Sequence, residues 1–164
     1  MIILEKTLLD FSKDINPDTE VITDEIMGGS SNAYFEQRER SLVFSGEVSL
    51  QNNGGFASGY IPVDIEDISG NHAFKIRVHG DGRQYGFSVK SDLTIQAVHR
   101  FYFDTYRQWQ EISIYFDQFS PYHRGSARPD RYGINLKKIQ SVGFMLADKK
   151  DGPFELLIDW IKLL

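Results

Sequence analysis

The sequence of 164 residues contains no cysteine, which excludes a disulfide scaffold, thiol catalysis and metal sites built from thiolates. No apolar run approaches the roughly 20 residues that span a bilayer as a helix, so we expect no membrane insertion. The first residues, Met1–Lys6, lack the basic start and sustained apolar core of a secretory signal. The cytoplasm is therefore the expected location.

Basic side chains are outnumbered, with 18 Lys and Arg against 23 Asp and Glu and a net charge of −5. This balance argues against a globally basic nucleic-acid binder, and a nucleic-acid partner is not expected. The charge is uneven, however, because residues 75–132 hold nine basic and six acidic side chains and most of the arginines. This middle segment forms either ordinary solvated strand faces or an anion- or partner-binding face. RNA binding through its arginines is a further alternative.

Helical periodicity is missing, and alternation with period two recurs along the chain. The 12 phenylalanines and 14 glycines are typical of a filled β core with many turns. Short helical turns are predicted only near 64–69 and 117–119. Two hairpins are expected, one turning at Asn52–Gly55 and one at Gly80–Arg83. Strands are predicted near 2–9, 20–26, 33–38, 42–50, 56–63, 74–79, 85–90, 96–103, 109–116, 139–147 and 154–163. The chain is thus predicted to be one all-β domain, residues 1–164, folded as a sandwich or barrel.

No catalytic constellation emerges from the sequence. Gly80-Asp81-Gly82 lies in a predicted hairpin turn without a following helix, so it is not a dinucleotide loop. Gly55–Gly59 has the wrong spacing for a nucleophile elbow. The four histidines are widely separated, and no pair of carboxylates stands out for acid–base work. We therefore predict a protein that is not an enzyme and has no catalytic residues.

A binding face has better support than a catalytic one. Alternation places a set of cationic, aromatic and small polar side chains opposite the core: Lys75, Arg77, His79, Ser88, Lys90, Arg100, Tyr102, Trp109, Glu111, Ser113 and Tyr115. Arginine, tyrosine and tryptophan dominate protein interfaces, whereas aromatic rings flanked by polar groups also suit sugars. Two interpretations stay open, a protein-interaction module and a carbohydrate-binding module with Tyr102 and Trp109 on one concave sheet.

A segment near the N-terminus carries a family resemblance. Thr23–Ser31, followed by Phe35, resembles the D-x-V-M-G-G-x-S signature of the complex I intermediate-associated protein family, the thirty-kilodalton one. Further segments follow in the family's order: residues 44–46, 54–58, 80–85, Trp109, Phe116, Phe119, 143–144 and 152–161. The resemblance covers nearly the whole chain. The targeting extension of mitochondrial members is not seen, so the chain is more like a bacterial single-domain member.

The resemblance implies a galactose-binding-like jelly-roll β-sandwich whose first and last strands pair. It also implies a non-enzymatic role in assembling a respiratory membrane complex through protein contacts, with assembly intermediates of NADH:ubiquinone oxidoreductase as candidate partners. Relatives in photosynthetic organisms act in RNA metabolism. The candidate residues for contact with a partner or ligand are Arg77, Arg83, Tyr85, Tyr102, Arg107 and Trp109.

The signature itself is interpreted mainly as architecture. Gly28 and Gly29 can adopt a positive φ or let another segment pass closely. Asp24 and Ser31 can satisfy N–H groups around that bend, and Met27 would fill the end of the sandwich. Direct ligand contact by this segment is the alternative, because glycine kinks also cluster at functional sites.

No cofactor is expected, but the superfamily resemblance suggests a structural calcium site. Asp10 and Asp159 occupy the places near the first and last strands where such sandwiches hold the ion. Calcium takes six to eight oxygen ligands, and only these two are evident. Pairing of Asp159 with a nearby basic group is therefore the favoured interpretation.

Overall fold

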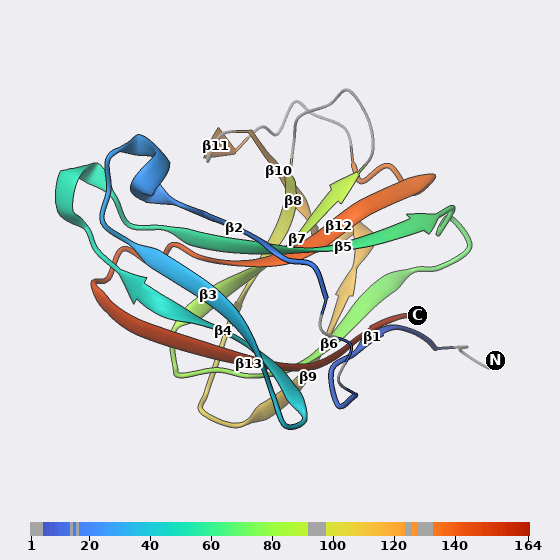
Figure 1. Ribbon diagram of the computed structural model, residues 1–164. Coiled ribbons are helices and arrows are strands. Elements are labelled where there is room, and N and C mark those ends of the chain that lie inside the picture. Colours follow the sequence, from blue (N-terminus) through green and yellow to red (C-terminus); the bar gives the residue numbers. More distant parts are fainter. Residues whose placement is uncertain (1–4, 14, 16, 92–97, 124–125, 128–132) are drawn as a thin grey trace.

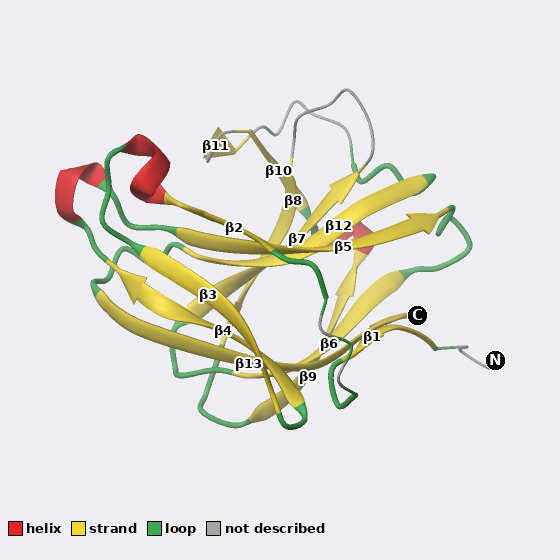
Figure 2. Cartoon of the chain, viewed as in Figure 1, coloured by secondary structure: helices red, strands yellow, loops and turns green. Residues whose placement is uncertain are grey.

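The computed structural model describes residues 5–13, 15, 17–91, 98–123, 126–127 and 133–164, and these form two stacked antiparallel sheets (Figures 1 and 2). One sheet, called sheet A, runs in the order β3-β4-β13-β6-β9, with β1 also paired to β13. Its strands are β1 (Lys6–Asp10), β3 (Asn32–Arg38), β4 (Ser41–Val48), β6 (Ala73–His79), β9 (Trp109–Tyr115) and β13 (Gly152–Leu163). The predicted all-β sandwich is confirmed.

The second sheet, sheet B, runs in the order β11-β10-β8-β7-β12-β5-β2. Its strands are β2 (Glu20–Thr23), β5 (Ala57–Glu66), β7 (Gln84–Ser91), β8 (Val98–Asp104), β10 (Ser120–His123), β11 (Ser126–Ala127) and β12 (Lys138–Leu146). The expected pairing of the first and last strands is also confirmed, because Lys6 of β1 lies opposite Leu163 of β13. Among the described residues, no helix has the length and apolar character needed to cross a membrane.

In the part of the chain that the structure describes, helical structure is limited to three short 3-10 turns, η1 (Asp24–Met27), η2 (Gln51–Asn53) and η3 (Phe116–Gln118). The last agrees with the turn predicted near 117–119. The helical turn predicted near 64–69 is wrong, because β5 continues to Glu66 and a short irregular connection follows. Charged side chains alternate along the exposed end of this strand. In so short a segment, such a pattern cannot be told apart from one turn of a helix.

Both predicted hairpins are wrong in the same way. β4 lies in sheet A and β5 in sheet B, and β6 and β7 are divided likewise. The Asn/Gly-rich and Gly-Asp-Gly turns therefore carry the chain from one sheet to the other. Alternation and turn residues indicate two strands and a reversal, but both arrangements bury the same apolar faces, so the pattern does not distinguish them.

The core lies between the sheets and is rich in phenylalanine. Phe44 of β4 is fully buried, with ring centroids 5.1 Å from both Phe35 and Phe154. Gly59 of β5 faces this cluster from sheet B, where a Cβ would lie 2.3 Å from the Phe35 ring. A missing side chain in one sheet thus makes room for an aromatic group from the other.

Candidate functional site

The signature segment is organised around one buried carboxylate. Asp24, at the start of η1, is fully buried and accepts four hydrogen bonds. Two come from the backbone N–H and hydroxyl of Ser31, at 2.9 and 2.5 Å, and two from the N–H groups of Gly55 and Phe56. Burial alone would raise the pKa of Asp24, but these donors outweigh it and hold the pKa below its ordinary value of 3.8. Asp24 therefore ties the η1 connection to the β4–β5 connection.

The glycines around Asp24 are required by space and by backbone conformation. Gly28 has a φ of +87°, which favours glycine, and a Cβ on Gly29 would lie 2.4 Å from an Asp24 carboxylate oxygen. This geometry supports the architectural interpretation of Asp24, Gly28, Gly29 and Ser31. The side chain of Met27 lies outside the described part of the chain, so its expected place at the end of the sandwich stays a prediction.

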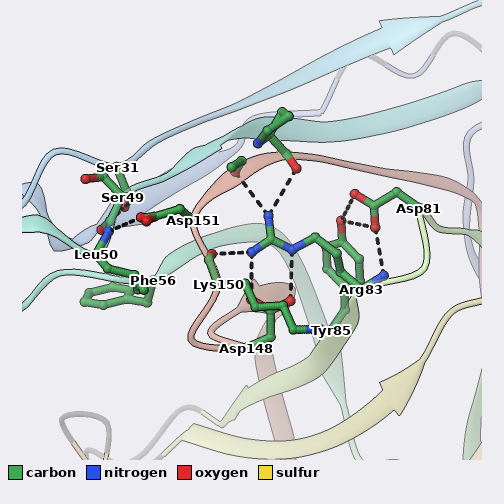
Figure 3. A network of polar contacts seen from close by, with 12 residues as sticks. Ser31, Ser49, Leu50, Phe56, Asp81, Arg83, Tyr85, Asp148, Lys150 and Asp151 are labelled. Atoms are coloured by element: carbon green, nitrogen blue, oxygen red, sulfur yellow. Dashed lines mark hydrogen bonds and ion pairs between the residues drawn. The ribbon is translucent and has the colours of Figure 1, made fainter.

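Arg83 joins two connections between the sheets (Figure 3). Its side chain is 12% exposed, and Nη2 and Nε lie 2.7 and 2.9 Å from the two carboxylate oxygens of Asp148. The guanidinium also donates to the carbonyl oxygens of Lys150, Gly152 and Pro153. Its donors are thus used inside the protein, which gives Arg83 a structural role, and contact of Arg83 with a partner stays a prediction.

Tyr85 is likewise not a surface residue. It is fully buried in β7, and its hydroxyl donates to Asp81, 3.1 Å from both carboxylate oxygens (Figure 3). Burial, reinforced by the charge of Asp81, raises the pKa of Tyr85. Asp81 also accepts from the N–H of Glu155, so the carboxylate links β7 to β13. The place of Tyr85 in the core corrects its assignment to a binding face.

Arg77 and Trp109 do form a common surface, on the outer side of sheet A. The guanidinium carbon of Arg77 lies 4.8 Å from the centroid of the Trp109 ring, and Arg77 Nε is 2.9 Å from a carboxylate oxygen of Asp159. His79 meets the same ring in a T-shaped contact at 5.5 Å. Trp109 nevertheless stays 37% exposed. We call Arg77, His79, Trp109 and Asp159 the Trp109 face.

The connection from β8 to β9 leads into this surface along the chain and carries exposed side chains. Tyr106 is 63% exposed, and Arg107 is exposed with a φ of +56°. Both lie just before Trp109 in the chain. Sequence reasoning selected Arg107 but missed Tyr106, because an aromatic residue beside a strand end gives no signal of its exposure.

Tyr102 lies elsewhere, on β8 of sheet B, where its ring meets Tyr122 at 6.0 Å. Trp109 belongs to sheet A, so the expectation of one concave sheet carrying Tyr102 and Trp109 is wrong. The middle segment does not form one arginine face either, since Arg77 and Arg100 belong to different sheets. Three further arginines of that segment, Arg124, Arg128 and Arg131, fall outside the described residues.

The two calcium candidates have other partners. Asp10 accepts hydrogen bonds from the backbone N–H and the hydroxyl of Ser12. Asp159 forms an ion pair with Arg77, which confirms the expected pairing with a nearby basic group. Within the described ranges, no three His, Cys, Asp or Glu side chains lie close enough together to hold a metal ion. These two residues alone do not fit a site for an ion that takes six to eight oxygens, and calcium stays only an alternative to the expected absence of a cofactor.

Comparison with known families identifies the class of this sandwich. The profile of the family described as complex I intermediate-associated protein 30 matches residues 9–158, and the chain belongs to this family. Complex I intermediate-associated protein 30, mitochondrial, of Mus musculus is 32% identical over 86% of this chain and 50% of its own length. The Neurospora crassa protein of the same name is 27% identical over 69% and 44%. The chain thus spans half or less of these relatives, whose names place them in mitochondria; its cytoplasmic location stays a prediction.

The solved structures that the chain resembles include carbohydrate-binding modules. The family 11 module of a cellulosomal cellulase from Clostridium thermocellum superposes with a TM-score of 0.73 and 20% identity, over 100% of this chain and 96% of that one. A family 30 carbohydrate-binding module gives a TM-score of 0.60 at 11% identity, covering 99% of each chain. At such identities the likeness establishes the galactose-binding-like β-sandwich fold alone.

Proposed function

We propose that the chain is a non-enzymatic binding module that acts through protein contacts in the assembly of respiratory complex I, the NADH:ubiquinone oxidoreductase. The match of the family profile over residues 9–158 carries this proposal. The named relatives are intermediate-associated proteins of that complex, so the partners of this chain are assembly intermediates of the same complex or of another membrane complex.

The Trp109 face is the surface best suited to such a partner. Arg77 and His79 hold the indole ring in place, so little side-chain freedom is lost when a partner covers its exposed part. Tryptophan and arginine are the residues on which binding energy most often concentrates. Tyr106 and Arg107, which precede Trp109 in the chain, offer an exposed aromatic ring and a charge to the same partner.

The test is affinity capture of the tagged full chain from detergent-solubilised membranes of cells that contain complex I. We expect complex I subunits to be recovered, as identified by native electrophoresis and mass spectrometry. Trp109→Ala should lower recovery at least tenfold, because truncating an interface hot spot costs about 2 kcal/mol or more.

Tyr34→Ala is the matched control, since Tyr34 is an exposed aromatic residue on β3, at the other edge of sheet A. Its recovery should equal that of the unmodified chain. Capture without any complex I subunit would overturn the assembly role. Equal recovery by Trp109→Ala and the unmodified chain would instead remove the Trp109 face from the contact.

A further inference from the structure

Two cationic side chains lie on the outer face of sheet B, on the other sheet from the Trp109 face. Arg100 of β8 is 5% exposed, and Lys90 of β7 is half-buried. Among the described residues, neither forms an ion pair with a carboxylate, and neither has an interaction beyond those given below. Burying a cation without a counter-ion is unfavourable, so this pair calls for a functional explanation.

Glycines build the floor on which these side chains lie. A Cβ on Gly86 would come within 2.6 Å of Arg100 Cδ, and one on Gly143 would come within 2.6 Å of the Tyr60 ring. Arg100 and Tyr60 therefore lie over glycines of neighbouring strands. Ser88 stands between them in register, opposite Arg100 on one side and Gly143 on the other.

Both cations retain N–H donors that have no acceptor among the described residues. Arg100 Nε donates to the Ser88 hydroxyl at 2.8 Å, and its guanidinium carbon lies 5.3 Å from the Tyr122 ring. Its two terminal nitrogens donate to no acceptor among the described residues. Neither of them is buried away from solvent. Lys90 Nζ lies 3.6 Å above the Tyr60 ring. Burial lowers the pKa of Lys90 and Arg100 lowers it further, while Glu20 acts in the opposite sense.

A hollow of about 310 Å³ opens beside Lys90, and its lining includes Tyr60, Pro62 and Ser141 together with the acidic residues Asp18 and Glu20. Such a volume suits a ligand no larger than a monosaccharide. Glu20 lies opposite Tyr60 on β2, which is the edge of the sheet remote from β8. A negatively charged group would therefore be repelled at the β2 edge and attracted toward Arg100.

We propose that the outer face of sheet B binds a small ligand that carries an oxyanion, a carboxylate or a phosphate, which is held between Arg100 and Lys90. The terminal nitrogens of Arg100 supply a planar pair of donors for two oxygens of such a group. The Tyr60 ring and the hollow beside it receive the uncharged remainder of the ligand. This site goes beyond the proposed assembly role and shares no residue with the Trp109 face.

The experiment is a titration of the purified full chain at low salt, followed by amide chemical shifts and calorimetry. The probes are inorganic phosphate, glucuronate and glucose, the last being a neutral counterpart of glucuronate. We expect saturable shifts at Ser88, Arg100 and Gly143 with phosphate, glucuronate or both, and none with glucose. Binding of phosphate alone assigns a phosphate ligand, and binding of glucuronate alone assigns a carboxylate.

Lys90→Met and Arg100→Gln should each weaken binding at least tenfold. Lys90→Met keeps an apolar chain over Tyr60, so it tests the site even if Arg100→Gln fails to fold. Arg38→Gln removes an exposed arginine from sheet A and should leave binding unchanged. Glucose binding as tight as glucuronate, absence of saturation with both anions, or full affinity in Lys90→Met would overturn the proposal.

Discussion

At the scale of single residues, Asp24 shows how a short signature serves the fold. Its carboxylate accepts hydrogen bonds from four donors, which belong to two different connections of the chain. The sequence allowed this interpretation because an aspartate, two glycines and a serine at a bend suggest N–H groups in need of an acceptor. It could not show that Gly55 and Phe56, more than 30 residues away, supply half of the donors.

We expect Asp24→Asn to lower the free energy of unfolding by about 2–4 kcal/mol, because an amide places N–H groups against other N–H donors in a buried site. The folded-state pKa of Asp24 is depressed, so its contribution is complete above the unfolded-state pKa and is lost as pH falls through the folded-state value. The difference between variant and unmodified chain should therefore shrink below about pH 4. Urea unfolding at several pH values measures this. Glu25→Gln, at the exposed neighbour, should change little, and a pH-independent difference would contradict the assignment.

At the scale of strands and connections, the sequence indicated the strands well and their partners poorly. Alternation located β6 and β7, and Gly80–Arg83 marked the reversal between them. The contact that anchors this reversal is Arg83 with Asp148, and no pattern linked two residues 65 positions apart. Arg83 looked like an interface residue because sequence alone does not show where the donors of a guanidinium are used.

Arg83→Lys should lower the free energy of unfolding by about 1–3 kcal/mol, because an ammonium group cannot reach the carboxylate and three carbonyl oxygens together. Hydrogen exchange should also accelerate in the β12–β13 connection. Thermal unfolding and hydrogen exchange of the amides of residues 148–152 measure both effects. Arg38→Lys, with exposed ion pairs to Glu36 and Glu155, is the control and should change stability by less than about 0.5 kcal/mol. Equal effects of the two variants would contradict the structural role of Arg83.

At the scale of the whole molecule, the fold class followed from composition and periodicity, whereas the division of the candidate residues between two faces did not. Trp109 and Tyr102 both alternate outward from the core, and only the assignment of β8 and β9 to different sheets separates them. An outward direction relative to the core is a local property, but the sheet to which a strand belongs depends on all the others.

Phe44→Ala should lower the free energy of unfolding by about 3–5 kcal/mol, since its ring is fully buried where both sheets meet. Trp109→Ala, at a partly exposed ring, should cost about 1 kcal/mol or less. Urea unfolding monitored by circular dichroism compares the two. If Trp109→Ala cost more stability than Phe44→Ala, the assignment of Phe44 to the core and of Trp109 to the surface would be wrong.

The crossing of the chain from sheet to sheet has a consequence for its integrity. A cut within Gly80–Arg83 would leave β1–β6 on one fragment and β7–β13 on the other. In sheet A, β13 of the second fragment lies between β4 and β6 of the first, and in sheet B, β5 lies between β12 and β2. Neither fragment holds a complete sheet, so the strand pairing would keep the two fragments of a nicked molecule together. Each fragment alone would have strands without their partners.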